Sequence, residues 1–150
     1  MKFSILIANY NNGKYFADCY QSIISQTYQN WEAIIVDDAS TDDSWNVMHS
    51  IVGNDDRFKF YQNDENSGVG VTKAKLIELA NGEICGYCDP DDALSPDALQ
   101  DAVYIFNNDK NVVLTYSNFY DCNKNLQPLN ISEASKPAPS QDLYFFNCPI

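Results

Sequence analysis

The chain has 150 residues, of which 45% are hydrophobic and 13% aromatic, so it suits one globular domain with a real core. This composition excludes an intrinsically disordered chain. Nine Lys and Arg against 21 Asp and Glu give a formal net charge of −12, which excludes the basic surface of a general nucleic-acid-binding protein. We therefore expect no nucleic-acid partner.

The apolar runs of the sequence are short. None approaches the ~20 residues that span a bilayer. The opening, residues 1–7, lacks the long apolar region and the cleavage site of a signal peptide, and it is typical of a first β-strand. The expected compartment is the cytoplasm.

The five cysteines form an odd set, which indicates reduced thiols in a chain without an export signal. Cys85 and Cys88 have the spacing of a thioredoxin-type redox motif. They lie within a predicted strand, where positions three apart point to opposite faces of the sheet. We therefore expect these thiols to pack rather than to bridge.

The first half of the chain alternates short apolar runs with segments of helical period. Thr41 is the predicted cap of the second helix, with Asp42 and Asp43 in its first turn, where acidic side chains favour the positive helix end. The predicted elements are a strand over residues 3–8, a helix over 14–26, a strand over 31–36, the capped helix, and a strand over 57–61.

The second half continues the same alternation. After a loop over residues 63–70, a helix runs to about Ala80, and Asn81-Gly82 is expected to end it in a left-handed exit. Ser95 and Pro96 are the predicted N-cap and first residue of a further helix. The other predicted elements are strands over 83–88, 112–120 and 126–131, the last two pairing across 123–125, and a loop over 132–140.

This order predicts an α/β fold, a mostly parallel sheet with helices on both faces, which binds ligands at the carboxyl ends of its strands. Polar clusters follow three of the predicted strands. We expect all three to meet at one edge of the sheet. They are Asn9-Tyr10-Asn11, Asp37-Asp38 and Asp89-Pro90-Asp91-Asp92.

The acidic clusters have two readings each. Asp89, Asp91 and Asp92 suit a solvated turn before a helix, or a site in which carboxylates bind Mg²⁺ or Mn²⁺ and leave positions for phosphate oxygens. Asp37 and Asp38 suit capping at a strand end, or a carboxylate that accepts the imide N–H of a pyrimidine or a ribose hydroxyl. His49, the only histidine, is expected to pack or lie at the surface rather than to catalyse.

The motifs, taken in order, closely resemble the opening of family 2 glycosyltransferases of the GT-A fold, which is Rossmann-like. The likeness covers about residues 3 to 120, and the ordered set is far more specific than any single motif. The matching segments are Ser4 to Asn11, Ser25 to Tyr28, Val36 to Asp42, Asn66-Ser67-Gly68, Ala80 to Glu83, Asp89 to Asp92, and Ser95-Pro96-Asp97.

The resemblance implies an enzyme that transfers a sugar from a nucleotide-diphosphate donor, commonly a UDP-sugar, to an acceptor hydroxyl with inversion. A divalent Mn²⁺ or Mg²⁺ would neutralise charge on the departing diphosphate. The residues that the resemblance places at the donor are Ala8, Asn9, Tyr10, Asp38, Gly68, Lys73, Asp89 and Asp91, with Asp89 and Asp91 at the metal.

Single roles also follow from the resemblance. Ala8 and Tyr10 would line the base pocket, and Asp38 would contact uracil N3. Asp89 would approach the ribose and metal, Asp91 would be the principal metal ligand, and Asp92 would support the metal shell or a bound water.

The sequence departs from the family pattern at several positions. The usual Pro before Tyr-Asn is replaced in Ile7-Ala8-Asn9-Tyr10, and the usual Ala-Arg-Asn becomes Thr72-Lys73-Ala74, followed by Leu76 instead of Gly. Because Lys lacks the planar fork of Arg, nucleotide affinity or base preference can differ here.

Family members usually continue for about another hundred residues, which normally hold the inverting base. We therefore expect 1–150 to be a single donor-binding domain, the N-terminal part of a longer enzyme, whose catalytic base lies beyond residue 150. An exposed edge of an incomplete fold would favour self-association. A saccharide or lipid-linked acceptor would bring the full-length enzyme to the inner face of the membrane.

Two other classes compete with the enzyme. A non-catalytic nucleotide-sugar-binding module would share the fold and lack the base. A cation-binding domain would need no nucleotide, so UDP binding with and without Mn²⁺ separates it from the other two.

Overall fold

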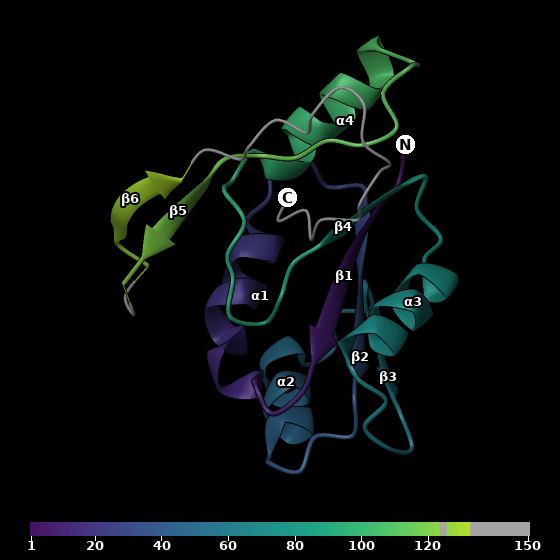
Figure 1. The fold of residues 1–150 in the computed structure, drawn as a ribbon, viewed down its shortest axis with the longest axis vertical. Coiled ribbons are helices and arrows are strands. Elements are labelled where there is room, and N and C mark those ends of the chain that lie inside the picture. The colour runs from purple at the N-terminus through teal and green to yellow at the C-terminus, as the bar shows by residue number, and fades with distance from the viewer. Residues whose placement is uncertain (124–125, 133–150) are drawn as a thin grey trace.

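The computed structural model describes residues 1–123 and 126–132. Its centre is a four-stranded parallel sheet with the order β3-β2-β1-β4 (Figure 1). The chain moves outward from β1 to β2 and β3, then returns to the far side of β1. The strands are β1 (Phe3–Asn9), β2 (Trp31–Asp37), β3 (Phe58–Gln62) and β4 (Ile84–Tyr87).

Helices cover both faces of the sheet. Because crossovers between parallel strands are right-handed, reversing the direction of travel after β3 places the next helix on the opposite face. Accordingly α1, α2 and α4 pack on one face and α3 on the other, which confirms the predicted α/β class. The helices are α1 (Phe16–Ile24) after a 3-10 turn (Gly13–Tyr15), α2 (Ser44–Val52), α3 (Val69–Leu79) and α4 (Ala98–Asn108).

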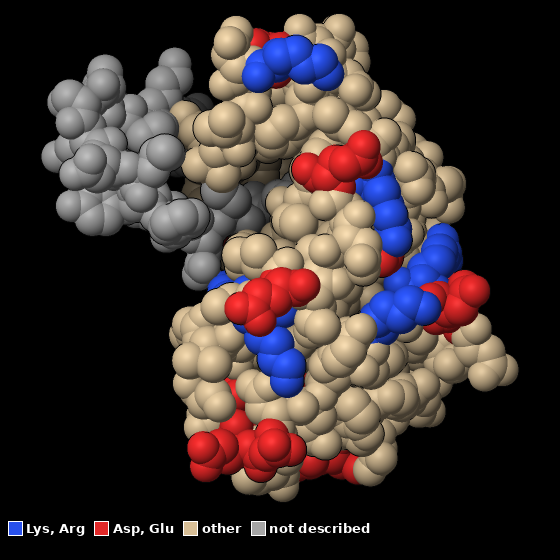
Figure 2. Space-filling model, turned by 90° about the vertical axis from the view of Figure 1, so that its right-hand side faces the viewer, with Lys and Arg blue, Asp and Glu red and all other residues tan. Residues whose placement is uncertain are grey.

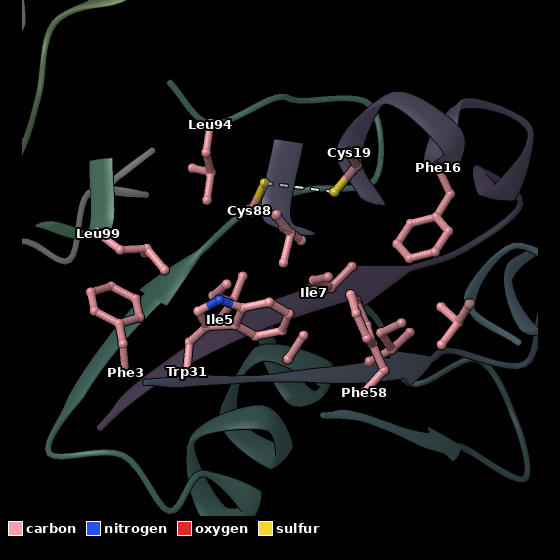
Figure 3. Close-up of a cluster of buried hydrophobic side chains, with 14 of the residues drawn as sticks. Phe3, Ile5, Ile7, Phe16, Cys19, Trp31, Phe58, Cys88, Leu94 and Leu99 are labelled. Carbon is pink, nitrogen blue, oxygen red and sulfur yellow. Dashed lines mark hydrogen bonds between the residues drawn. The ribbon is translucent and has the colours of Figure 1, made fainter. Parts of the chain in front are cut away.

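The two central strands are buried on both faces, which explains why their sequences are nearly continuous apolar runs. Figure 3 shows the larger core, where Phe3, Ile5 and Ile7 of β1 meet Phe16 of α1 and Leu99 of α4. On the opposite face, four fully buried side chains join α3 to the sheet: Leu6, Ile34, Val36 and Leu76. The described residues include no helix with the length and apolar character needed to cross a bilayer.

The last two strands form a separate antiparallel hairpin, β5 (Phe119–Cys122) with β6 (Pro128–Ser132). The predicted pairing is confirmed, but the predicted strand over 112–120 is wrong, since only its last two residues are in β5. Phe119 already pairs with Ser132, the last residue of β6, so the described part of β6 offers no partner to residues 112–118. Backbone groups without a neighbouring strand to take their hydrogen bonds do not form a β-strand. The predicted loop over 132–140 lies outside the described residues from 133 onward.

Several predicted helix ends are wrong. Helix α4 begins at Ala98 with Asp97 as N-cap, because residues 95–98 form a preceding turn in which the Ser95 carbonyl accepts the Ala98 N–H. Helix α2 has Asp43 as N-cap, since Thr41 binds the Asn11 side chain instead. Helix α1 is shorter than predicted at both ends.

Another wrong helix end concerns Gly82. Helix α3 stops at Leu79, and Ala80 leaves it in an extended conformation, so no left-handed exit occurs there. Gly82 is needed for a different reason. A Cβ at this position would lie 2.7 Å from the Ser4 backbone nitrogen and 2.8 Å from the Lys2 carbonyl oxygen.

Candidate functional site

The three polar clusters meet at the carboxyl edge of the sheet, because β1 lies between β2 and β4. They surround a pocket of about 440 Å³. Seven of the eight residues that the family resemblance placed at a donor line it, and the eighth, Lys73, contacts one of them. The lining residues are Ala8, Asn9, Tyr10, Asn12, Asp38, Asn66, Gly68, Val69, Thr72, Asp89, Pro90 and Asp91.

Asp38 anchors the loop that leads into α3. Its Oδ1 accepts hydrogen bonds from the Asn63 Nδ2 (2.7 Å) and the Ser67 N–H (2.9 Å), and its Oδ2 accepts the Gly68 N–H (2.8 Å). Burial alone raises the pKa of Asp38, but the hydrogen bonds from Ser67, Asn63 and Gly68 outweigh it, so the pKa lies below its usual range. The carboxylate is therefore ionised and fixed in orientation at the pocket wall.

Asp37 lies on the other face of the sheet and does not line the pocket. It is fully buried, and its carboxylate accepts hydrogen bonds from Asn9 Nδ2 (2.6 Å), the Ser40 N–H (3.0 Å) and Gln62 Nε2 (3.0 Å). These contacts tie the ends of three strands together. Of the two acidic neighbours, Asp37 takes the capping role and Asp38 faces the pocket.

The loop after β1 is bound to the loop after β2. Asn11 has a positive φ of 53°, and its Oδ1 accepts the backbone N–H groups of Thr41 (2.8 Å) and Asp42 (3.2 Å).

Asn9 and Tyr10 differ in exposure. Asn9 is 2% exposed, and its Oδ1 is buried without a hydrogen-bond partner among the described residues. Tyr10, in contrast, is 46% exposed at the pocket. Its ring is accessible to a planar ligand.

The acidic loop supplies the opposite wall. Asp89 and Asp91 line this pocket, whereas Asp92 faces a larger neighbouring one of about 930 Å³ that Asp91 also borders. Burial, followed by the negative charges of Asp91 and Asp89, raises the pKa of Asp92. The positive charge of Lys73 opposes this effect. A further cation would relieve the remaining repulsion among the three carboxylates.

Lys73 reaches the acidic loop from α3. Its Nζ lies 3.5 Å from Asp89 Oδ1 and 4.9 Å from the centre of the Tyr87 ring, whose hydroxyl donates to the Lys73 carbonyl (3.2 Å). Lys73 thus places a positive charge beside a pocket whose other charged groups are carboxylates.

The remaining candidates for chemistry are the thiols and His49. Cys85 and Cys88 lie on opposite faces as predicted, but the expected packing is confirmed only for Cys88, since Cys85 is exposed. The Cys88 sulfur lies 3.7 Å from the Cys19 sulfur. His49 stacks on Phe60 with ring centres 3.8 Å apart, which confirms the packing role expected for it.

Five lining residues were not assigned from the sequence: Asn12, Asn66, Val69, Thr72 and Pro90. Val69 and Thr72 are three apart in the first turn of α3, so they share a helix face. The spacing of Val69 and Thr72 could identify them as pocket residues only if the first residue of α3 were already known. The face shown in Figure 2 carries Lys and Arg side chains interspersed with Asp and Glu side chains rather than as a continuous basic patch.

Comparisons with known proteins agree with this fold. The model of the family described as glycosyl transferase family 2 matches residues 4–147. Glycosyltransferase GlyG of Streptococcus pneumoniae is 31% identical over 118 residues, 79% of this chain and 39% of that protein. The Escherichia coli glucosyltransferase WfaP is 32% identical over 117 residues, 78% of this chain and 45% of that protein.

Among solved structures, S. aureus TarS in complex with UDP-GlcNAc has a TM-score of 0.67 and 30% identity, over 72% of this chain and 32% of that one. This chain therefore spans less than half the length of these relatives. The family match over nearly the whole chain, together with the parallel sheet and its helices, leads to one conclusion: the chain belongs to family 2 of the glycosyltransferases and has their GT-A fold.

Proposed function

We propose that this chain binds the nucleotide diphosphate of a UDP-sugar in the pocket between Asp38 and Asp91, as the donor-binding part of an inverting glycosyltransferase. The observation that carries the proposal is the meeting of carboxylates 53 positions apart in sequence at one pocket beside an exposed Tyr10 ring. TarS, a relative at 30% identity, is known in complex with UDP-GlcNAc.

The base would lie between Ala8 and Tyr10 and meet Asp38. A carboxylate offers about four acceptor positions, and three are occupied by Asn63, Ser67 and Gly68, with the Thr72 hydroxyl beside the fourth. The imide N–H of uracil would take this fourth position in place of Thr72, whose hydroxyl also donates to the Gly68 carbonyl. Because the other three hold the carboxylate in place, the base would be selected without rearrangement of Asp38.

The phosphates would lie between the start of α3 and the acidic loop. Gly68, the N-cap of α3, has a φ of 85° and no atom within 4 Å of the position a Cβ would take, so a ligand can approach the backbone there. Lys73 would contribute positive charge. Asn9 would act indirectly, through the Asp37 contacts that hold the pocket wall.

A divalent Mn²⁺ or Mg²⁺ fits the acidic loop. Nucleotide-bound Mg²⁺ needs only one or two protein carboxylates, and Asp89 and Asp91 both face the pocket. No three His, Cys, Asp or Glu side chains in residues 1–123 and 126–132 are grouped to hold a metal alone, so binding would require the diphosphate. When bound, the cation would neutralise charge on the leaving diphosphate.

Inversion requires an acceptor hydroxyl to attack the face of the sugar opposite the diphosphate, with a general base to take its proton. The name of WfaP gives a UDP-glucose donor and an α-D-GlcNAc-diphosphoundecaprenol acceptor. We extend this class of acceptor, saccharide or lipid-linked, to the whole protein, which would then act at the inner face of a membrane.

Calorimetry of UDP binding with and without Mn²⁺ tests the proposal. We expect Mn²⁺ to strengthen UDP binding by about tenfold or more, equivalent to about 1.4 kcal/mol. Asp91→Asn should remove this enhancement, and Asp38→Asn should remove the preference for UDP over GDP. Asp18→Asn, an exposed change on α1, is the matched control. Equal UDP affinity with and without metal in the unchanged chain would contradict the proposal.

A further inference from the structure

A buried glutamine outside the pocket is bonded to the segment that follows the acidic loop. Gln26 follows the end of α1 and is 1% exposed. Its Nε2 donates to the carbonyls of Ser95 (2.7 Å) and Ser22 (3.1 Å), and its Oε1 accepts the Leu99 N–H (3.1 Å). A polar side chain buried this completely is stable only because both ends are bonded.

The Leu99 N–H is one of the unpaired donors in the first turn of α4. The N-cap residue, Asp97, makes no side-chain capping bond, because its Oδ1 accepts the Thr27 hydroxyl at 2.9 Å. Gln26 therefore caps α4 from a different element. The start of α4 is fixed relative to α1 rather than by its own sequence.

The same side of α1 holds the loop at other points. Ser22 Oγ accepts the Leu94 N–H (3.1 Å), and the Cys19 and Cys88 sulfurs are 3.7 Å apart (Figure 3). The segment that carries Asp89 and Asp91 is thus bounded on both sides by residues attached to one helix. The carboxylates within it repel one another, so they stay together only if the ends of the segment are fixed.

We infer that Gln26 is a positioning residue for the metal-dependent part of donor binding, an inference that rests on the function proposed above. It does not line the pocket that Tyr10 and Asp38 border. Loss of its hydrogen bonds would let the loop and the start of α4 move. Contacts with the base would be retained.

The experiment compares UDP affinity with and without Mn²⁺, by calorimetry on the 150-residue chain, in four forms. These are the unchanged chain, Gln26→Met, Gln26→Glu and the control Gln21→Met, which alters an exposed glutamine of α1. Methionine keeps the length of Gln26 and removes its hydrogen bonds. Glutamate keeps the acceptor for the Leu99 N–H and loses the donor to Ser95.

Gln26→Met should lower the Mn²⁺ enhancement by about tenfold, as loss of outer-shell support does at metal sites, and change metal-free UDP affinity by less than about twofold. Gln26→Glu places a carboxylate oxygen against the Ser95 and Ser22 carbonyls, so it should lower the Mn²⁺ enhancement at least as much. Gln21→Met should match the unchanged chain. If Gln26→Met does not fold by circular dichroism, the Gln26→Glu comparison decides.

Two outcomes overturn the inference alone: an undiminished Mn²⁺ enhancement in the Gln26 variants, or equal losses with and without metal, which would mean a merely structural role. An unchanged chain without Mn²⁺ enhancement would overturn the proposed function first. The two failures are therefore distinguishable.

Discussion

Asp37 and Asp38 show how two identical neighbours acquire different roles. Successive side chains at the end of a strand point to opposite faces of the sheet. Asp37 meets Asn9, Ser40 and Gln62 and is fully buried, whereas Asp38 meets the loop before α3 and borders the pocket. The Asp37 carboxylate therefore links the ends of β1, β2 and β3 by hydrogen bonds, and the Asp38 carboxylate borders the pocket.

Asp38→Asn should destabilise the fold by about 1 kcal/mol, because at least one part-buried N–H of Ser67 or Gly68 loses its charged acceptor. The folded-state pKa of Asp38 lies below its unfolded value of about 3.9. Its ionised form thus contributes stability above that value and loses it as the pH falls through the folded pKa. Urea unfolding from pH 6 downward should show a shallower acid dependence in the variant. Parallel curves would contradict this.

Ala39 has a φ of 58°, a left-handed conformation that is costly for a residue with a Cβ. Ala39→Gly should raise the free energy of unfolding by about 0.5 kcal/mol, the strain relieved less the extra entropy of glycine in the unfolded chain. Urea denaturation measures the change. Ala39→Val should be destabilising, and a more stable Val variant would refute the strain argument.

At the scale of elements, the close approach of the α3–β4 connection to β1 depends on Gly82. Gly82→Ala should destabilise by about 1–3 kcal/mol, because the added Cβ meets backbone atoms of Ser4 and Lys2 that cannot move aside. Gly70→Ala is the matched control. It lies in α3 with nothing within 4 Å of its Cβ position and should gain up to about 1 kcal/mol. Equal losses in the two variants, measured by urea denaturation, would contradict this account.

At the scale of the whole molecule, a net charge of −12 coexists with a pocket proposed to bind another anion. A divalent cation and Lys73 would have to offset that repulsion. UDP with Mn²⁺ at a hundredfold excess over Kd should therefore stabilise the fold by about 2.7 kcal/mol, seen as a rise in Tm. UDP with chelator, or GDP with Mn²⁺, should raise Tm less, and equal shifts for all three would contradict the base and metal assignments.

Much of the fold could be predicted because its signals are local. The buried strands β1 and β2 are near-continuous apolar runs, and the amphipathic segments of α1 and α4 have one apolar side. Helix ends were less predictable, because their hydrogen-bond partners come from distant segments. Thr41 binds Asn11, and α4 is capped by Gln26 rather than by Ser95.

The sequence alone determined the α/β class, the family and the set of polar residues that follow the strands, because strand period, helix period and ordered motifs are properties of neighbouring residues. Only the tertiary structure decided that Asp38 rather than Asp37 faces the pocket, that Cys88 meets Cys19, and that Gln26 binds the Ser95 carbonyl and the Leu99 N–H. These choices depend on which side of the sheet a residue occupies and on contacts between segments as many as 73 positions apart. Local sequence does not encode such contacts.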